Sequence, residues 1–113
     1  MERGAVILVG LDPTVGREQR GVRPCVVVSD PSVNAHQRFP LICVIPITGA
    51  PGEGGLYPRL APGSSGLSKT SYALVDHIRA IDKRRVLRKF GGVDERELRE
   101  IDEGLRLFLG LVD

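Results

Sequence analysis

Arg23 stands where a polar loop with glycines at both ends meets an apolar strand, in the stretch GREQRGVRPCVVVSD from Gly16 to Asp30. Its guanidinium stays charged and presents a rigid fork of donors that matches the oxygens of phosphate. A second apolar stretch ends at Thr48, whose hydroxyl is able to donate to the same oxygens. Taken alone, Arg23 is also explained as a surface cation and Thr48 as the β-branched end of a strand. Together they indicate an anion site, suited to stabilising charge on a reacting phosphate.

His77 is the strongest candidate for proton transfer, because histidine exchanges a proton readily near neutral pH. It follows Asp76 at the end of a predicted strand, and Arg79 lies two residues further along the chain. The three side chains form a polar cluster, although a simple surface turn explains the same residues. His36 lies in a loop without such neighbours and is expected to be exposed.

Other catalytic sets find little support in this sequence. Neither histidine accompanies a GxSxG-like motif, and neither glycine-containing loop carries the Lys-Ser or Lys-Thr pair of a nucleotide-binding P-loop. Cys25 and Cys43 lie singly inside apolar stretches, without the CxxC spacing of a zinc site or a disulfide framework. We therefore expect two buried free thiols, no metal site and no cofactor. The stretch 52–55 is expected to be a flexible loop rather than a phosphate cradle.

Length and composition allow one domain over residues 1–113. A chain of 113 residues buries roughly two-thirds of its unfolded surface, enough for one modest core. With 42% hydrophobic and 27% charged residues, it is typical of a soluble globular protein with an aliphatic core. The sequence has no signal-peptide pattern and no apolar run of about 20 residues, so the default expectation is a cytoplasmic protein without membrane contact.

The small net charge of +2 hides an uneven distribution of charges. The stretch 79–89 holds six Lys or Arg residues and one Asp, whereas 94–103 is mostly acidic. This pattern indicates a positive face on an otherwise balanced surface, although an ordinary solvated face explains it equally well.

Short apolar stretches separated by Gly, Pro and Ser predict a series of strands. The expected strands span 5–11, 22–29, 40–48, 56–60, 70–76 and, with a weaker pattern, 84–90. The connections expected between them are loops over 49–55 and 61–68, a turn from Asp30, and one helical turn over 79–83.

The last part of the chain predicts an amphipathic helix. Asp94 is suited to cap its first turn, Glu97 completes a capping box three residues later, and Gly110 ends it. Four apolar residues at helical spacing form one stripe: Leu98, Ile101, Leu105 and Phe108. The predicted fold class is therefore mainly β, a small barrel of five to seven short strands, with a helix that plugs an open end or lies on one face.

In their order along nearly the whole chain, these motifs resemble the MazF/PemK family of toxin endoribonucleases. The block GxEQxGxRPxxVVS is the most specific part of the resemblance. The matching pieces are Arg3-Gly4, Leu11-Asp12-Pro13, Gly16 to Gly21, Val22-Arg23-Pro24 followed by VVVS, Pro46-Ile47-Thr48-Gly49, the stretch 74–79 with 81–83, and Leu109-Gly110-Leu111.

The resemblance implies a small SH3-like barrel with a C-terminal helix, assembled as a homodimer. It implies a metal-independent ribonuclease that cuts single-stranded RNA at short sequences and inhibits translation by degrading messenger RNA. The RNA 2′-hydroxyl attacks the adjacent phosphate and leaves a 2′,3′-cyclic phosphate and a 5′-hydroxyl. A cognate antitoxin with an acidic, disordered tail inhibits such toxins, and we expect it to bind to the basic stretch 79–89.

The resemblance also assigns roles to residues by position. Arg23 and Thr48 match the catalytic Arg and Thr of the family, while Glu18 and Gln19 match the loop that covers the RNA.

Asp76 and His77 depart from the family pattern, which commonly has Glu-Gln before Ile-Arg at these positions near the RNA. We expect Asp76, His77 and Arg79 to contact substrate, with a sequence preference that the departure leaves open. Either Glu18 or His77 is available as the proton acceptor.

Two other functions stay open at this point. A toxin of the same fold without nuclease activity would bind a protein target such as a topoisomerase, although the intact pair of Arg23 and Thr48 argues against it. A plain nucleic-acid-binding barrel would bind RNA and leave it uncut.

Overall fold

The computed structural model describes residues 1–13, 15–18 and 21–111. These residues form seven strands, two α-helices and two 3-10 helices. In chain order the elements are β1 (Ala5–Gly10), β2 (Val22–Val27), α1 (Pro31–Ala35), β3 (Leu41–Thr48), β4 (Arg59–Leu60), β5 (Ser71–Ala73), η1 (Val75–His77), β6 (Arg79–Asp82), η2 (Lys83–Arg85), β7 (Val86–Gly92) and α2 (Glu95–Leu109).

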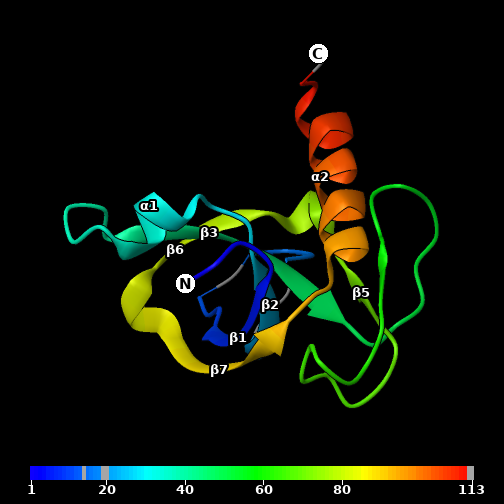
Figure 1. Ribbon diagram of the computed structural model, residues 1–113, viewed down its shortest axis with the longest axis horizontal. Coiled ribbons are helices and arrows are strands. Elements are labelled where there is room, and N and C mark those ends of the chain that lie inside the picture. Colours follow the sequence, from blue (N-terminus) through cyan, green and yellow to red (C-terminus); the bar gives the residue numbers. More distant parts are fainter. Residues whose placement is uncertain (14, 19–20, 112–113) are drawn as a thin grey trace.

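The strands form a strongly bent antiparallel sheet, whose curve is visible in Figure 1. Its order is β4-β5-β3-β2-β1-β7, and β6 pairs with the first half of β3. Strand β3 changes partners along its length, because residues 41–44 pair with β6 and residues 47–48 pair with β5. The sheet therefore curls into a half-barrel, which confirms the mainly β fold predicted from the sequence.

Apolar side chains cover both faces of the sheet, as the continuous apolar run of β1 predicts. Successive residues of a strand point to opposite faces, so Val6 and Ile7 belong to different clusters. The buried residues of the first cluster are Ala5, Ile7, Val9, Leu11, Cys25, Val27, Ile42, Val44 and Ile81. Those of the second cluster are Val6, Val26, Val28, Ile45, Ile47, Leu60, Ala73, Val75 and Ile101.

Helix α2 begins and ends as the sequence predicts. The Asp94 carboxylate accepts the backbone N–H of Glu97, and the Glu97 carboxylate accepts the N–H of Asp94, which completes the capping box. The second Glu97 oxygen accepts the N–H of Ala61 at 2.7 Å, so the same carboxylate fixes the start of the loop after β4. Gly110 ends the helix in the left-handed conformation, with a φ of 70°.

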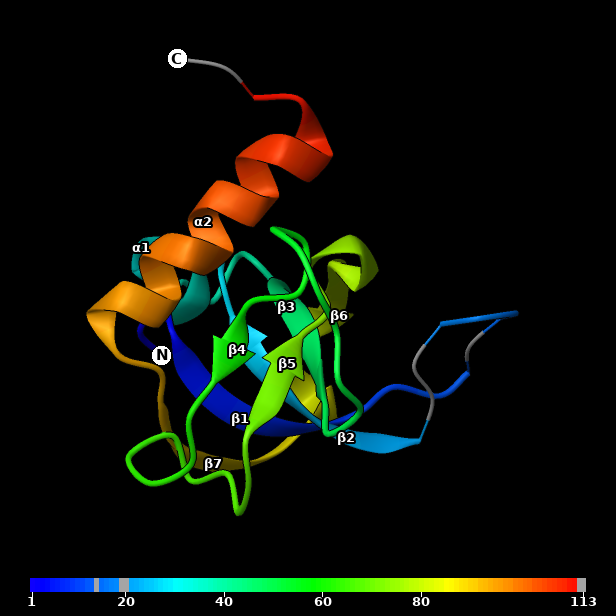
Figure 2. The same ribbon diagram turned by 90° about the vertical axis from the view of Figure 1, so that its right-hand side faces the viewer.

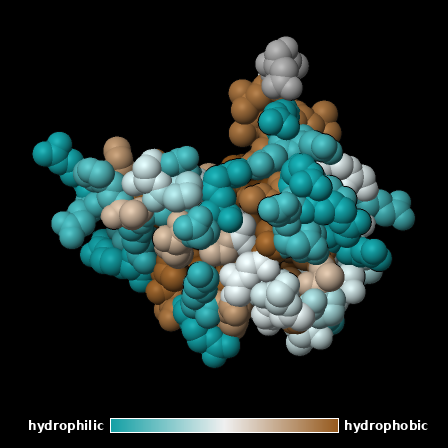
Figure 3. Space-filling view, viewed as in Figure 1, coloured by the Kyte–Doolittle hydropathy of each residue, from teal (hydrophilic) through white to brown (hydrophobic). Residues whose placement is uncertain are grey.

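The first half of α2 lies against the sheet, and the second half extends beyond it (Figures 1 and 2). Ile101 is fully buried, whereas Phe108, at the far end of the predicted stripe, is exposed together with Leu107 and Leu109. Apolar side chains accordingly gather around the projecting end of the helix in Figure 3. Within the described part of the chain, no helix is long and apolar enough to cross a membrane.

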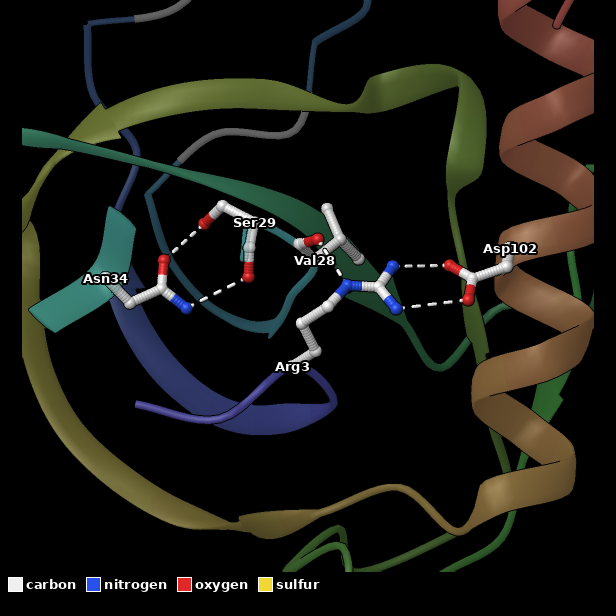
Figure 4. Close-up of polar contacts among 5 residues, drawn as sticks. All are labelled: Arg3, Val28, Ser29, Asn34 and Asp102. Atoms are coloured by element: carbon white, nitrogen blue, oxygen red, sulfur yellow. Dashed lines mark hydrogen bonds and ion pairs between the residues drawn. The ribbon is translucent and has the colours of Figure 1, made fainter. Parts of the chain in front are cut away.

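Arg3 connects the N-terminus, the sheet and α2 through one guanidinium group (Figure 4). Its Nε donates to the carbonyl oxygen of Val28 at 2.8 Å, and its two terminal nitrogens donate to the Asp102 carboxylate, one of them at 3.1 Å. Beside it, the Asn34 amide donates to the Ser29 carbonyl at 3.0 Å and accepts from the Ser29 hydroxyl. These bonds hold α1 and α2 to the end of β2.

The helical turn predicted over 79–83 is wrong, because residues 79–82 form β6. Strand β6 pairs antiparallel with β3, with Val44 opposite Arg79 and Leu41 opposite Asp82, and its Ile81 side chain joins the core. Residues 79–82 are extended because they pair with β3, which lies nearly forty residues earlier in the chain. No local sequence pattern indicates this pairing. The 3-10 turn η2 follows instead, capped by the Asp82 carboxylate.

The strand predicted over 70–76 is shorter than expected. Strand β5 covers only 71–73, and the chain then turns into η1, which carries Asp76 and His77. The turn predicted from Asp30 continues as the short helix α1, because the Asp30 carboxylate caps it through the Ser32 N–H and a proline occupies its first turn.

Candidate active site

The pairing of β2 with β3 brings Arg23 and Thr48 together. The ladder between β2 and β3 ends with Cys25 opposite Pro46, which leaves Arg23 and Thr48 each two residues beyond this last pair, at the same end of the two strands. Both residues then point to one face of the sheet, because side chains two positions apart in a strand share a face. On its other side, Arg23 pairs with Val9 of β1, so its backbone is held within the sheet while its side chain is exposed.

The Thr48 hydroxyl oxygen accepts the backbone N–H of Ala50 at 3.1 Å. A hydroxyl has one proton and two lone pairs, so this bond leaves the proton able to donate outward. Beside it lies a hollow of about 270 Å³, here called the Thr48 hollow. Its lining residues are Thr48, Ala50, Pro51, Gly52, Tyr57, Leu74 and His77.

A second hollow, of about 280 Å³, shares His77 with the first and is called the Glu18 hollow. It is lined by Arg17, Glu18, Pro46, Asp76, His77, Ile78 and Arg79. Four of the predicted substrate-contacting residues therefore meet here: Glu18, Asp76, His77 and Arg79. Arg23 lines neither hollow but lies at the same end of β2 and β3 as Thr48, and the predicted Gln19 lies outside the described residues.

The segment between β1 and β2 that carries Glu18 is here called the Glu18 loop. Arginine side chains hold the end of β1, where this loop begins. Arg79 donates to the carbonyl oxygen of Leu11 at 3.2 Å, and Arg85 donates to the carbonyls of Gly10 and Asp12. Within the loop, the Glu18 carboxylate accepts the N–H of Val15 at 2.6 Å. One Glu18 oxygen and one Arg79 nitrogen thus have positioning roles, in addition to the places of both residues in the hollow.

Tyr57, Asp76 and His77 form a polar group at the junction of the two hollows. The Tyr57 hydroxyl donates to Asp76 Oδ2 at 2.8 Å, and this bond is the main reason that the pKa of Tyr57 is raised. Asp76 Oδ1 is buried, has no hydrogen-bond partner among the described residues and lies 3.7 Å from His77 Nε2. The sequence does not reveal a role for Tyr57, because its partner Asp76 is nineteen residues away. A single tyrosine in a short strand pattern gives no indication of a functional site.

Lys69 is a second residue that sequence analysis missed. A Cβ atom placed on Gly49 would lie 2.5 Å from Lys69 Cε and 2.7 Å from its amine nitrogen, so the lysine side chain lies against the residue after Thr48. It adds a positive charge near the predicted anion site. The loop from which it comes contains no motif that points toward Thr48.

The basic stretch 79–89 is largely engaged within the chain. Lys83 donates to the carbonyl oxygens of Val33 and His36, Arg84 pairs with Asp82 at 3.0 Å, and the Arg88 guanidinium lies 4.5 Å from the centre of the Phe90 ring. These contacts orient the cations without cancelling most of their charge.

Neither cysteine is placed for nucleophilic chemistry. Cys25 is buried in the core and Cys43 is half-buried, and both are free thiols. Burial raises the pKa of Cys25 to about 12, so its thiolate is scarce at neutral pH. Among the described residues, no group of three or more His, Cys, Asp or Glu side chains could hold a metal ion.

A family model described as the PemK-like, MazF-like toxin of type II toxin–antitoxin systems matches residues 2–109. The endoribonuclease MazF of Staphylococcus saprophyticus is 30% identical over an alignment of 113 positions, which covers 98% of this chain and 92% of that protein. Among solved structures, MazF of Deinococcus radiodurans has a TM-score of 0.84 at 27% identity, covering 98% of this chain and 97% of the other.

Two solved complexes have the same fold. A mycobacterial endoribonuclease bound to its cognate antitoxin has a TM-score of 0.81 at 21% identity and covers 100% of this chain and 98% of its own. The MazE–MazF complex of Deinococcus radiodurans has a TM-score of 0.77 at 26% identity, with coverage of 99% and 97%.

Proposed function

Because the chain belongs to the family of PemK-like and MazF-like toxins of type II toxin–antitoxin systems, we propose that Arg23 and Thr48 form its RNA-cleaving centre. The protein is an endoribonuclease toxin. The observation that carries the assignment of residues is the register of β2 and β3, which leaves Arg23 and Thr48 at the same end of the two strands, with Thr48 lining one of two adjacent hollows.

The reaction proposed is attack of an RNA 2′-oxygen on the adjacent phosphorus. The new O2′–P bond forms as the P–O5′ bond breaks, leaving a 2′,3′-cyclic phosphate and a 5′-hydroxyl end. The nucleophile belongs to the substrate, so the reaction needs no metal-bound water. Holding the 2′-oxygen in line with the scissile bond supplies a large share of the rate enhancement.

Arg23 and Thr48 would stabilise the negative charge that builds on the phosphate oxygens. The Arg23 fork donates two parallel hydrogen bonds, and the Thr48 proton, free of the Ala50 bond, donates a third. Donors placed in this way are worth about a hundredfold to a thousandfold each in rate. The Lys69 amine, lying against Gly49, adds long-range attraction for the RNA backbone.

Single-stranded RNA would lie along the two hollows. Unpaired bases expose their pairing edges, and the Glu18 hollow offers them carboxylates, guanidinium groups and an imidazole. Of the residues that the structure describes, Tyr57 is the only Phe, Tyr or Trp lining either hollow, so recognition would depend on hydrogen bonding more than on stacking. Gln19 is proposed to join the residues that cover the RNA.

The proposed partners follow from the family. We infer a homodimer, restrained in the cytoplasm by a cognate antitoxin with an acidic tail, as the antitoxin complexes of the relatives indicate. The stretch 79–89 still carries five more positive than negative charges, so it is the proposed landing surface for that tail.

Purified protein incubated with a long RNA and EDTA tests this proposal. We expect cuts at defined sequences, with a loss of about a hundredfold to a thousandfold in rate for Arg23→Ala and for Thr48→Val. Thr48→Ser, which keeps the hydroxyl, should retain most of the activity. Arg99→Ala on the exposed face of α2 and Thr70→Val in an exposed loop are the matched controls. RNA that is bound and left uncut would overturn the proposal.

A further inference from the structure

Among the described residues, His77 alone lines both hollows, so an RNA strand that passes from one hollow to the other must pass its imidazole. We propose that His77 is a catalytic residue, the base that removes the 2′-hydroxyl proton, and that Asp76 and Tyr57 position it. This inference rests on the proposed function. It concerns a position where this chain has Asp-His in place of the Glu-Gln expected from the resemblance.

The Asp76 carboxylate is held in a defined orientation. Tyr57 binds one of its oxygens at 2.8 Å, and the other oxygen is buried without a hydrogen-bond partner among the described residues. Leaving a charged acceptor buried and unsatisfied is costly. The adjacent ring offers His77 Nε2 as a donor, 3.7 Å from this oxygen.

A carboxylate that faces Nε2 favours the tautomer with its proton on that atom. The lone pair of Nδ1 is then available to accept a proton, and the carboxylate stabilises the imidazolium that results. Both side chains are mostly buried, at 23% and 28% exposed, which restricts their motion and strengthens their interaction.

Several charged and titratable groups surround His77. Asp76 precedes it on η1, Tyr57 faces it from the loop before β4, Arg17 and Glu18 come from the loop after β1, and Arg79 comes from β6. Helix α2 packs against η1 through Gly104 and Val75.

Glu18 is the competing base, but its carboxylate already accepts the Val15 N–H at 2.6 Å and braces its own loop. In the step proposed, His77 Nδ1 takes the proton as the O2′–P bond forms and the P–O5′ bond breaks. The departing 5′-oxygen takes a proton from water, and the imidazolium afterwards returns its own proton to water.

The test is single-turnover cleavage of a defined RNA between about pH 5 and about pH 8.5, with wild type, His77→Gln and His36→Gln. Wild type should lose activity about tenfold per pH unit on the acidic side, because an imidazolium cannot accept a proton. His77→Gln should be at least about a hundredfold slower at neutral pH and lose this acidic limb. His36→Gln, at an exposed histidine away from both hollows, should match wild type.

The positioning role of Asp76 is tested separately, through the pH dependence of the cleavage rate. Asp76→Asn should move the acidic limb to lower pH, because losing a nearby negative charge favours neutral imidazole. It should also slow the maximal rate by roughly tenfold or more. A merely structural role for Asp76 would lower the amount of active protein without moving the limb.

Wild-type cleavage combined with an unchanged rate or an unchanged acidic limb in His77→Gln would overturn this inference and leave the proposed function intact. Absence of RNA cleavage by wild type would instead overturn the proposed function. Thermal unfolding of each variant shows whether it folds, and His77→Asn takes the place of His77→Gln if the latter does not.

Discussion

At the residue scale, the roles in this site depend on which polar atoms the fold already uses. Thr48 accepts one backbone bond and keeps its proton for a substrate, whereas Arg79 and Glu18 each use one atom to hold the Glu18 loop. Asp76 has one oxygen fixed by Tyr57 and one oxygen left over. The types of these residues are visible in the sequence, but the remaining capacity of each side chain is not.

The Asp82 carboxylate gives the fold a pH-dependent contribution. Hydrogen bonds from the Arg84 side chain, followed by that from its backbone N–H, lower the pKa of Asp82 from 3.8 to about 2. The native state therefore binds fewer protons than the unfolded chain between these values, and the stabilisation is present above pH 3.8 and lost as the pH falls through about 2. Asp82→Asn should lower the melting temperature at neutral pH and have little effect near pH 2.

Glu53→Gln, at an exposed carboxylate in the loop after β3, is the control for this comparison. Its melting temperature should follow that of wild type at both pH values. An equal loss of stability by Asp82→Asn at neutral pH and near pH 2 would show that the charge contributes nothing.

At the scale of elements, the candidate active site depends on how closely α2 approaches η1 and the loop before β4. A Cβ atom on Gly104 would lie 2.6 Å from the Gly55 carbonyl oxygen and 3.2 Å from a Val75 methyl group. Val75 directly precedes Asp76 and His77, so this contact between helix and turn sets the position of the polar residues.

Gly104→Ala should destabilise the protein, because the added methyl group has no space. Alanine gains about 1 kcal/mol of helix propensity over glycine, but overpacking against a backbone oxygen costs about 1–3 kcal/mol, so a net loss of about 1 kcal/mol is expected. RNA cleavage should fall as η1 shifts. Urea unfolding and cleavage rates measure the two effects.

Gly10→Ala provides the comparison, because among the described residues, apart from its two neighbours in the chain, no atom lies within 4 Å of a Cβ at Gly10 in β1. Its stability should stay within about 0.5 kcal/mol of wild type. A Gly104→Ala protein more stable than wild type would contradict the packing described here.

The sequence predicts those elements whose signals are local. Helix α2 is recognisable from Asp94, Glu97 and Gly110, because caps act through bonds to backbone groups a few residues away. Strand β6 is not recognisable, because its conformation depends on pairing with β3. The same distinction applies to the residues of the site. Arg23 and Thr48 are recognisable from their positions in predicted strands. Tyr57 and Lys69 are not recognisable, because only the tertiary fold brings them to the site.

At the scale of the whole molecule, the two hollows form one polar region where β3, η1, β6 and the Glu18 loop meet. The projecting end of α2 is a separate, apolar surface, with Leu107, Phe108 and Leu109 exposed. The net charge of +2 makes little contribution to RNA binding, so the local cations at the hollows must supply the attraction. The proposed activity therefore depends on chemistry at one place rather than on general affinity for nucleic acid.

The most direct test of the central claim is cleavage of a short RNA at its mapped site, compared with the same RNA carrying a single 2′-deoxynucleotide immediately 5′ of the scissile phosphate. The all-RNA substrate is expected to yield a 2′,3′-cyclic phosphate and a 5′-hydroxyl. The substituted RNA is expected to be bound with similar affinity and left uncut. Cleavage of the substituted RNA at the same site, or 3′-hydroxyl ends from either substrate, would contradict this claim.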